Sequence, residues 1–147
     1  MNPRSGLIVI LDANVLYPAS VRSFLLFIAS EGLFEPKWTD AIHEEWIKNL
    51  LEKRKDITRA NLEIVKSAMN AAFPDSTISG YEHLIQDLDL PDPNDRHVVA
   101  AARTSGVNLI VTNNKKDFPV KILNAYNLKV CSPFPTINCT SRINILA

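Results

Sequence analysis

The chain has 147 residues, 46% of them hydrophobic, which fits one domain of ordinary size with a full hydrophobic core. No apolar run is long enough to span a membrane, and the first residues, MNPRSG, lack the apolar core of a secretory signal, so we expect a cytoplasmic protein with no membrane partner. The formal net charge is zero, which excludes a globally basic surface for nucleic acid.

The first half of the chain is predicted to hold one buried strand followed by three helices. Residues 7–11, LIVIL, form a short apolar run rich in β-branched side chains, which is typical of a strand buried on both faces. Apolar residues at helical spacing predict helices over 20–31, 40–54 and 58–73. The dipeptide at 35–36, Glu-Pro, is expected to break the chain between the first two helices.

The second half is predicted to alternate strands and helices. The expected elements are, in order, a short strand over 77–78, a turn of helix over 82–85, a helix opened by Asp92 and Pro93 and closed by Gly106, a strand over 107–111, a short helix over 119–126 and a strand over 128–131. A strand, a helix and a second buried strand in succession form a βαβ unit, which implies a parallel sheet. The fold class is therefore predicted to be α/β.

We assign residues 1–131 to one domain and read 132–147 as an irregular tail with an apolar end. The two cysteines, Cys131 and Cys139, have no CxxC or CxxH spacing, so we expect two incidental thiols rather than a zinc site or a disulfide framework.

Charge is distributed unevenly along the chain. Six acids and no Lys or Arg lie between Lys66 and Arg96, whereas every charged residue after Asp117 is basic. An acidic centre with basic flanks would suit a cation site that a phosphate backbone approaches, or equally a solvated acidic loop.

Several acids fall where a parallel sheet would place its ligands, at the carboxyl ends of strands or at the start of the helix after Asp92. Gathered at one edge they would repel each other unless cations bind between them, which predicts a metal site. Oxygen ligands without His or Cys favour Mg²⁺ or Mn²⁺ over zinc. The candidate acids are Asp12, Glu45, Asp92, Asp95 and Asp117.

Each acid also has a purely structural interpretation. Asp92 could be only a helix cap, and Asp95 only a carboxylate stabilised by the helix dipole. We expect Asp95 to bind metal and Asp92 to support it. Glu44 and Glu45 point to different faces of their helix, and Glu45 is preferred because it directly precedes an apolar position.

Polar residues near the strand ends are candidate supports for these acids, although turn chemistry would explain them as well. Asn14 could hold a carboxylate in place, Thr112 could orient one, and Asn114 could accept a hydrogen bond or hold a metal-bound water. The three histidines have no ligand spacing, and each is interpreted as a surface or packing residue.

Four motifs in order, DANVLYP, EEWIKNLL, LPDPNDRHVVAAA and VTNNKKDFP, resemble those of PIN-domain nucleases, in particular toxins of toxin–antitoxin pairs related to the VapC type. The resemblance spans roughly residues 7–130 and implies a three-layer α/β/α sandwich with a central parallel sheet. Many PIN domains carry an aspartate where this chain has Asn114. The positions that match the family's acidic site are Asp12, Glu45, Asp95, Asn114 and Asp117.

The resemblance implies a metal-dependent endoribonuclease that acts on RNA, serves as the toxin beside an antitoxin protein, and forms a homodimer. Lys115, Lys116 or Arg96 could contact phosphates, or could be solvated surface charges. One alternative is a catalytically weak PIN fold that only binds RNA or an antitoxin. Another is a phosphatase of the haloacid-dehalogenase kind, which would require DxDxT where this chain reads DANVL; a phospho-receiver domain lacks a placeable acceptor and lysine.

Overall fold

Four parallel strands form the central sheet, in the order β2-β1-β3-β4. The computed structural model describes residues 6–133. The strands within them are β1 (Ile8–Leu11), β2 (Glu35–Lys37), β3 (Leu109–Val111) and β4 (Lys129–Cys131). The two central strands, β1 and β3, are almost entirely buried, as their continuous apolar sequences require.

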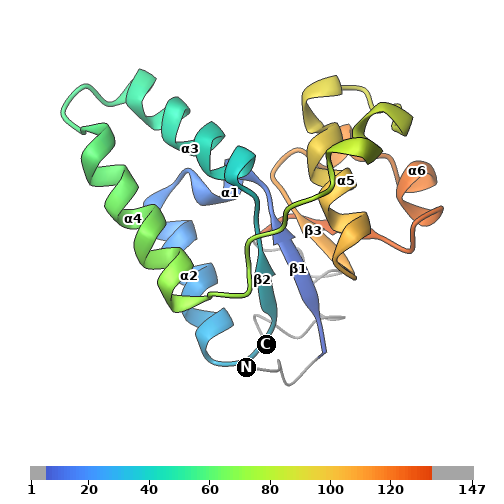
Figure 1. The fold of residues 1–147 in the computed structure, drawn as a ribbon, viewed down its shortest axis with the longest axis horizontal. Helices are drawn as coiled ribbons and strands as arrows, with labels where there is room; N and C mark the ends of the chain where they lie inside the picture. The colour runs from blue at the N-terminus through green and yellow to red at the C-terminus, as the bar shows by residue number, and fades with distance from the viewer. Residues whose placement is uncertain (1–5, 134–147) are drawn as a thin grey trace.

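Helices flank this sheet on both sides (Figure 1), which confirms the predicted α/β/α architecture. α3 and α4 lie side by side as an arm on one side of the view, and α5 and α6 lie on the other. The α-helices are α1 (Ala13–Leu16), α2 (Ala19–Ser30), α3 (Asp40–Lys53), α4 (Arg59–Ala72), α5 (Arg96–Thr104) and α6 (Val120–Asn124). Short 3₁₀ helices lie at η1 (Glu82–Asp87), η2 (Pro93–Asp95) and η3 (Lys115–Asp117).

The register of the central strands brings two distant segments together. Leu11 at the end of β1 pairs with Val111 at the end of β3. The residues that follow these two, Asp12 and Thr112, therefore leave the sheet side by side at its carboxyl edge. The backbone amide of Asp12 still donates to the Val111 carbonyl at 3.1 Å, which fixes the point where the chain turns into α1.

The segment before α5 starts as its sequence predicts. The Asp92 carboxylate accepts a hydrogen bond from the Asn94 amide at 2.9 Å, and Pro93 occupies the first position of η2. α5 begins one turn later, at Arg96, so Asp92 caps the 3₁₀ turn rather than the α-helix itself. Gly106, beyond the helix end, adopts a φ of 65°, which is a conformation that glycine adopts without strain.

The predicted break at residues 35–36 is wrong, because these residues begin strand β2. Proline lacks an amide hydrogen and is tolerated only where that donor is not needed, as on an edge strand. β2 lies at the edge of the sheet, and the amide that pairs with β1 there belongs to Glu35, which donates to the Leu7 carbonyl at 2.8 Å. Pro36 is buried without breaking the pairing.

Three smaller differences complete the comparison. The short helix α1 was not predicted, and the strand predicted at 77–78 is reduced to a single bridge between Trp38 and Thr77. Cys131 is disulfide-bonded, so the prediction of an incidental thiol is wrong for this residue. Cys139 and most of the predicted tail lie outside the described residues.

No helix in the range 6–133 combines the length and the apolar character needed to cross a bilayer.

Candidate metal centre

Asp12 is the most deeply buried of the candidate acids, with 3% of its surface exposed. Oδ1 accepts from the Ala13 amide at 2.8 Å. Oδ2 accepts from the Thr112 hydroxyl at 2.9 Å and from the Asn14 side-chain amide at 3.2 Å. Burial raises the pKa of Asp12, and the Thr112 hydrogen bond opposes that rise. Because a carboxylate oxygen has two lone pairs, Oδ1 keeps one for a further ligand.

Three other acids come together beside this strand end. Asp92, Asp95 and Asp117 each offer a carboxylate oxygen, and these oxygens lie within 4.8 Å of one another. Asp92 and Asp95 flank η2, and Asp117 ends η3, the turn that follows β3. All three side chains are partly exposed, so a cation could reach them from solvent.

Asp95 lies at the electrostatic centre of all five predicted acids. Burial and the negative charges of Asp12, Asp92, Asp117 and Glu45 raise the pKa of Asp95 from 3.8 to about 7. This carboxylate is therefore about half protonated at neutral pH, and a bound cation would displace the proton. Hard oxygen donors with surplus negative charge are the donor set that Mg²⁺ and Mn²⁺ prefer, so the residues present fit the predicted metal.

The two neighbouring glutamates of α3 face different surroundings. Glu44 is paired with Arg59 of α4 at 2.8 Å, on the exposed side of the helix pair. Glu45 instead adds its negative charge to the fields of Asp12 and Asp95. The structure therefore places Glu45, and not Glu44, with the other acids.

The supporting polar residues form a bridge between β1 and β3. Asn14 Nδ2 donates to Asp12 Oδ2 and to Thr112 Oγ1, while Asn14 Oδ1 accepts from the Asn113 amide at 2.9 Å. The backbone amide of Asn114 donates to Thr112 Oγ1 at 3.1 Å. The Asn114 residue is exposed, and its side chain makes no hydrogen bond with residues 6–133. Asn14 and Thr112 thus lie where they hold the Asp12 carboxylate.

The histidines differ in their surroundings. His43 is fully buried between Trp38 and Trp46, and its Nδ1 accepts from Trp46 Nε1 at 3.0 Å. Burial lowers the pKa of His43 to about 4. His83 is exposed on η1. His97 contacts Glu45 of the acidic group, which sequence reasoning missed; its position two residues after Asp95 was the available signal.

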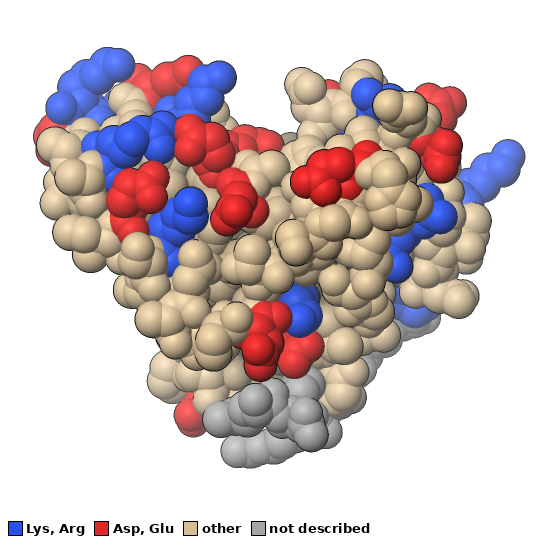
Figure 2. Space-filling model, in the orientation of Figure 1, with Lys and Arg blue, Asp and Glu red and all other residues tan. Residues whose placement is uncertain are grey.

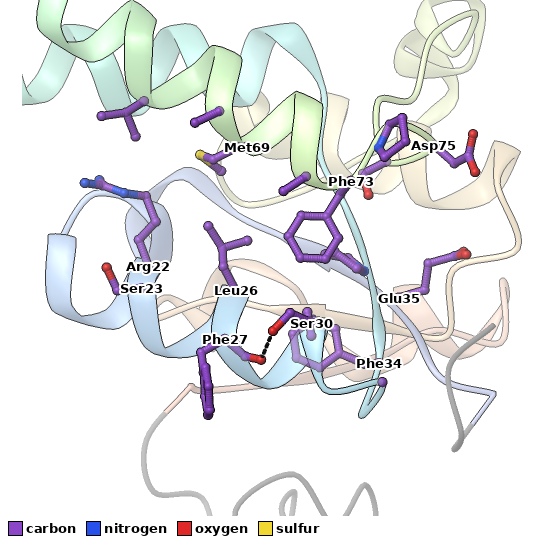
Figure 3. Close-up of a pocket in the computed structure, with 18 residues that line it drawn as sticks. Arg22, Ser23, Leu26, Phe27, Ser30, Phe34, Glu35, Met69, Phe73 and Asp75 are labelled. Atoms are coloured by element: carbon purple, nitrogen blue, oxygen red, sulfur yellow. Dashed lines mark hydrogen bonds between the residues drawn. The ribbon is translucent and has the colours of Figure 1, made fainter. Parts of the chain in front are cut away.

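The molecular surface is hollowed in two places. Figure 2 shows an indentation between the α3–α4 arm and the part of the molecule that carries η1 and α5, with acidic side chains on both sides of it. A separate pocket of about 600 Å³ lies between α2, α4 and the beginning of β2 (Figure 3). Its side chains are largely apolar, including Phe27, Phe34 and Met69, with Arg22 and Glu35 toward opposite ends. None of the five acids lines this pocket.

Comparison with known proteins agrees with the fold. The sequence profile described as the PIN domain matches residues 8–116, so the chain belongs to the PIN domain family. Among solved structures, the chain is similar to one chain in the structure of FitAB bound to an IR36 DNA fragment. The TM-score is 0.55 at 13% sequence identity, with 87% of this chain and 96% of that chain covered. No curated protein sequence matches this chain.

Proposed function

We propose that the protein is a metal-dependent endoribonuclease that hydrolyses phosphodiester bonds of RNA. The observation that carries the proposal is the convergence of four other acids on Asp95. Carboxylate oxygens of Asp92, Asp95 and Asp117 lie within 4.8 Å of one another, and burial together with the charges of the four acids raises the pKa of Asp95 to about 7. A carboxylate whose pKa is strongly raised by burial and by neighbouring acids is a candidate catalytic group. Membership of the PIN domain family adds to this interpretation.

The metal ligands we propose are Asp95 and Asp117, joined by Asp12 through its remaining Oδ1 lone pair and by Glu45 from α3. Asp92 is the third member of the group of close carboxylates. It would either bind the metal directly or support the ligands beside it. A bound Mg²⁺ or Mn²⁺ would polarise the scissile phosphate and lower the pKa of an attacking water. One of the carboxylates would accept the proton that this water releases.

Other residues are assigned to substrate binding and to orientation. Lys115 and Lys116 are exposed on η3, the same turn that carries Asp117, so they would contact phosphates flanking the cleaved bond. Thr112 and Asn14 would keep Asp12 turned toward the site through the hydrogen bonds that both donate to Oδ2.

The decisive experiment is RNA cleavage by purified protein with Mg²⁺, with Mn²⁺ and with a chelator. Asp12→Ala and Asp95→Ala should each remove at least about 99% of the activity, since each loses a metal-binding carboxylate. Asp75→Asn is a matched control, because Asp75 is an exposed acid outside the group. Cleavage that persists in chelator, or in both alanine variants, would contradict the proposal.

A second function, an RNA- or antitoxin-binding module without catalysis, is favoured by one observation. Asn114 stands where many PIN domains have an aspartate, so this chain has one carboxylate fewer at that position. If the wild type binds RNA without cleaving it and Asn114→Asp gains cleavage, the binding module is the better description. A covalent aspartyl-phosphate on Asp12 would instead indicate the phosphatase chemistry.

We also propose that the protein acts in the cytoplasm as the toxin of a toxin–antitoxin pair and that it forms a homodimer. The support is the resemblance of the four motifs and the likeness in fold to a chain of FitAB, a structure that holds a DNA fragment. Expression should arrest growth, and coexpression of the product of a neighbouring gene should restore it. Arrest that no neighbouring product relieves would contradict the antitoxin, and a monomer in sedimentation experiments would contradict the homodimer.

A further inference from the structure

His97 of α5 and Glu45 of α3 are in contact within the acidic group. Their closest atoms, Nε2 and Oε1, are 3.7 Å apart, which is close enough for an ion pair but longer than a hydrogen bond. The His97 side chain is 18% exposed, whereas the Glu45 side chain is 42% exposed. The histidine is thus the better-fixed member of the pair.

The burial of the other imidazole nitrogen determines which atom of His97 carries a proton. Nδ1 is buried and has no hydrogen-bond partner among residues 6–133. A proton on Nδ1 would be a buried donor without an acceptor, whereas a proton on Nε2 faces a carboxylate. The neutral imidazole therefore holds its proton on Nε2, directed at Glu45 Oε1.

Glu45 lacks the hydrogen bonds that fix Asp12 and Asp92. Asp12 is fixed by three hydrogen bonds, and Asp92 by its bond to the Asn94 amide. Within residues 6–133 the Glu45 carboxylate accepts no hydrogen bond, and its partly exposed side chain could rotate into solvent. This carboxylate contacts His97, and its negative charge contributes to the electrostatic field at Asp12 and Asp95.

We propose that His97 is a positioning residue that holds the Glu45 carboxylate in the metal centre through an Nε2–H donor. The inference rests on the proposed function, since it assigns Glu45 to metal binding. It also explains why a histidine follows Asp95 on α5: the same helix start supplies one ligand and the group that orients another. A shift of about half an ångström would bring the pair to hydrogen-bond distance.

The test is a double-mutant cycle read out by Mn²⁺ affinity, measured by calorimetry without RNA. His97→Gln keeps an amide donor near the Nε2 position, whereas His97→Asn reaches only the Nδ1 position and His97→Leu has no donor. We expect the Leu and Asn variants to bind Mn²⁺ roughly tenfold more weakly, as is usual when a ligand loses its orienting partner, and the Gln variant to bind nearly as the wild type. His83→Leu is the control, because His83 is exposed and outside the group.

The same substitutions are then made in a Glu45→Gln background. If His97 acts through Glu45, His97→Leu should change Mn²⁺ affinity less than twofold there, because the carboxylate that it orients is already gone. An equal loss in both backgrounds would show a merely structural role and overturn the proposal, as would wild-type affinity in His97→Leu and His97→Asn. If His97→Leu does not fold, the Gln and Asn pair decides the question.

RNA cleavage by the same proteins separates this inference from the proposed function. Mn²⁺ binding with the expected coupling but without RNA cleavage by the wild type would overturn the nuclease and leave the role of His97 standing. Metal-dependent cleavage without coupling would overturn the role of His97 alone. A wild type that neither binds Mn²⁺ nor cleaves RNA would overturn both.

Discussion

Replacing Asp95 by asparagine should stabilise the metal-free protein at neutral and higher pH. In the folded state the pKa of this carboxyl is raised from 3.8 to about 7 by burial and by four neighbouring acids. Between these two values the folded protein holds a proton that the unfolded chain has released. The free energy of unfolding therefore falls as pH rises through this interval, and the loss is complete above about pH 7.

The size of the effect follows from the same pKa. Each pH unit corresponds to about 1.4 kcal/mol, so the whole interval would amount to about 4 kcal/mol. Because the Asp95 side chain is partly exposed, solvent screening reduces this value, and we expect about 2 kcal/mol. Asparagine has nearly the same shape, cannot ionise, and sacrifices no hydrogen bond, since the Asp95 side chain makes no cap bond to α5.

The assay is urea denaturation of the wild type and Asp95→Asn in chelator at pH 4 and at pH 8. The variant should be more stable by about 2 kcal/mol at pH 8, which corresponds to a melting temperature roughly 4–8 °C higher, and nearly equal to the wild type at pH 4. Added Mn²⁺ should stabilise the wild type more than the variant and so reduce the difference in stability between them at pH 8. A variant that is no more stable than the wild type at pH 8, or an advantage of the same size at both pH values, would refute the reasoning.

Three further predictions concern other parts of the molecule. Thr112→Val removes the hydroxyl that donates to Asp12 Oδ2 at 2.9 Å and should lower the free energy of unfolding by about 1–2 kcal/mol in urea titrations. Thr112→Ser keeps a hydroxyl and should retain most of the wild-type stability. For His43, the folded pKa of about 4 lies below its usual 6.5, so the stability of the wild type relative to His43→Leu should fall by up to about 3 kcal/mol between pH 6.5 and pH 4; the same pH dependence in both proteins would contradict the assignment. The double variant Lys115→Ala and Lys116→Ala should weaken RNA binding in filter assays and reduce the slope of log affinity against log salt by about 1–2; an unchanged slope would place the phosphates elsewhere.

The sheet and the order of its central elements could be predicted because local sequence determines them. A continuous apolar run such as residues 7–11 cannot be exposed on either face, and a strand, a helix and a second such run leave a parallel pairing as the simple solution. Edge strand β2 could not be predicted in this way. Its three residues, Glu35–Lys37, include a proline and become a strand only because β1 is available to pair with them.

The candidate site shows the same division. Asp12 and Asp117 follow buried strands, so their place at the carboxyl edge follows from sequence. The choice between Glu44 and Glu45 depends on which helix face meets α4, and the Arg59 ion pair that occupies Glu44 is a tertiary contact. Asp92 was expected only to support Asp95, yet the turn at η2 brings a carboxylate oxygen of each to within 4.8 Å of one on Asp117. The pairing of His97 with Glu45 likewise joins helices whose relative position no local pattern specifies.

The hydrogen bond between Thr112 and Asp12 joins residues 100 positions apart in the chain. Glu45, Asp92 and Asp117 add contacts from three more segments, so a growing polypeptide on the ribosome lacks the complete set until nearly all of the domain has been synthesised. Such long sequence separations slow folding, because distant segments must meet before their contacts form. The acidic group can therefore form only after Asp117, the last of its members in the chain, has left the ribosome and β3 has paired with β1.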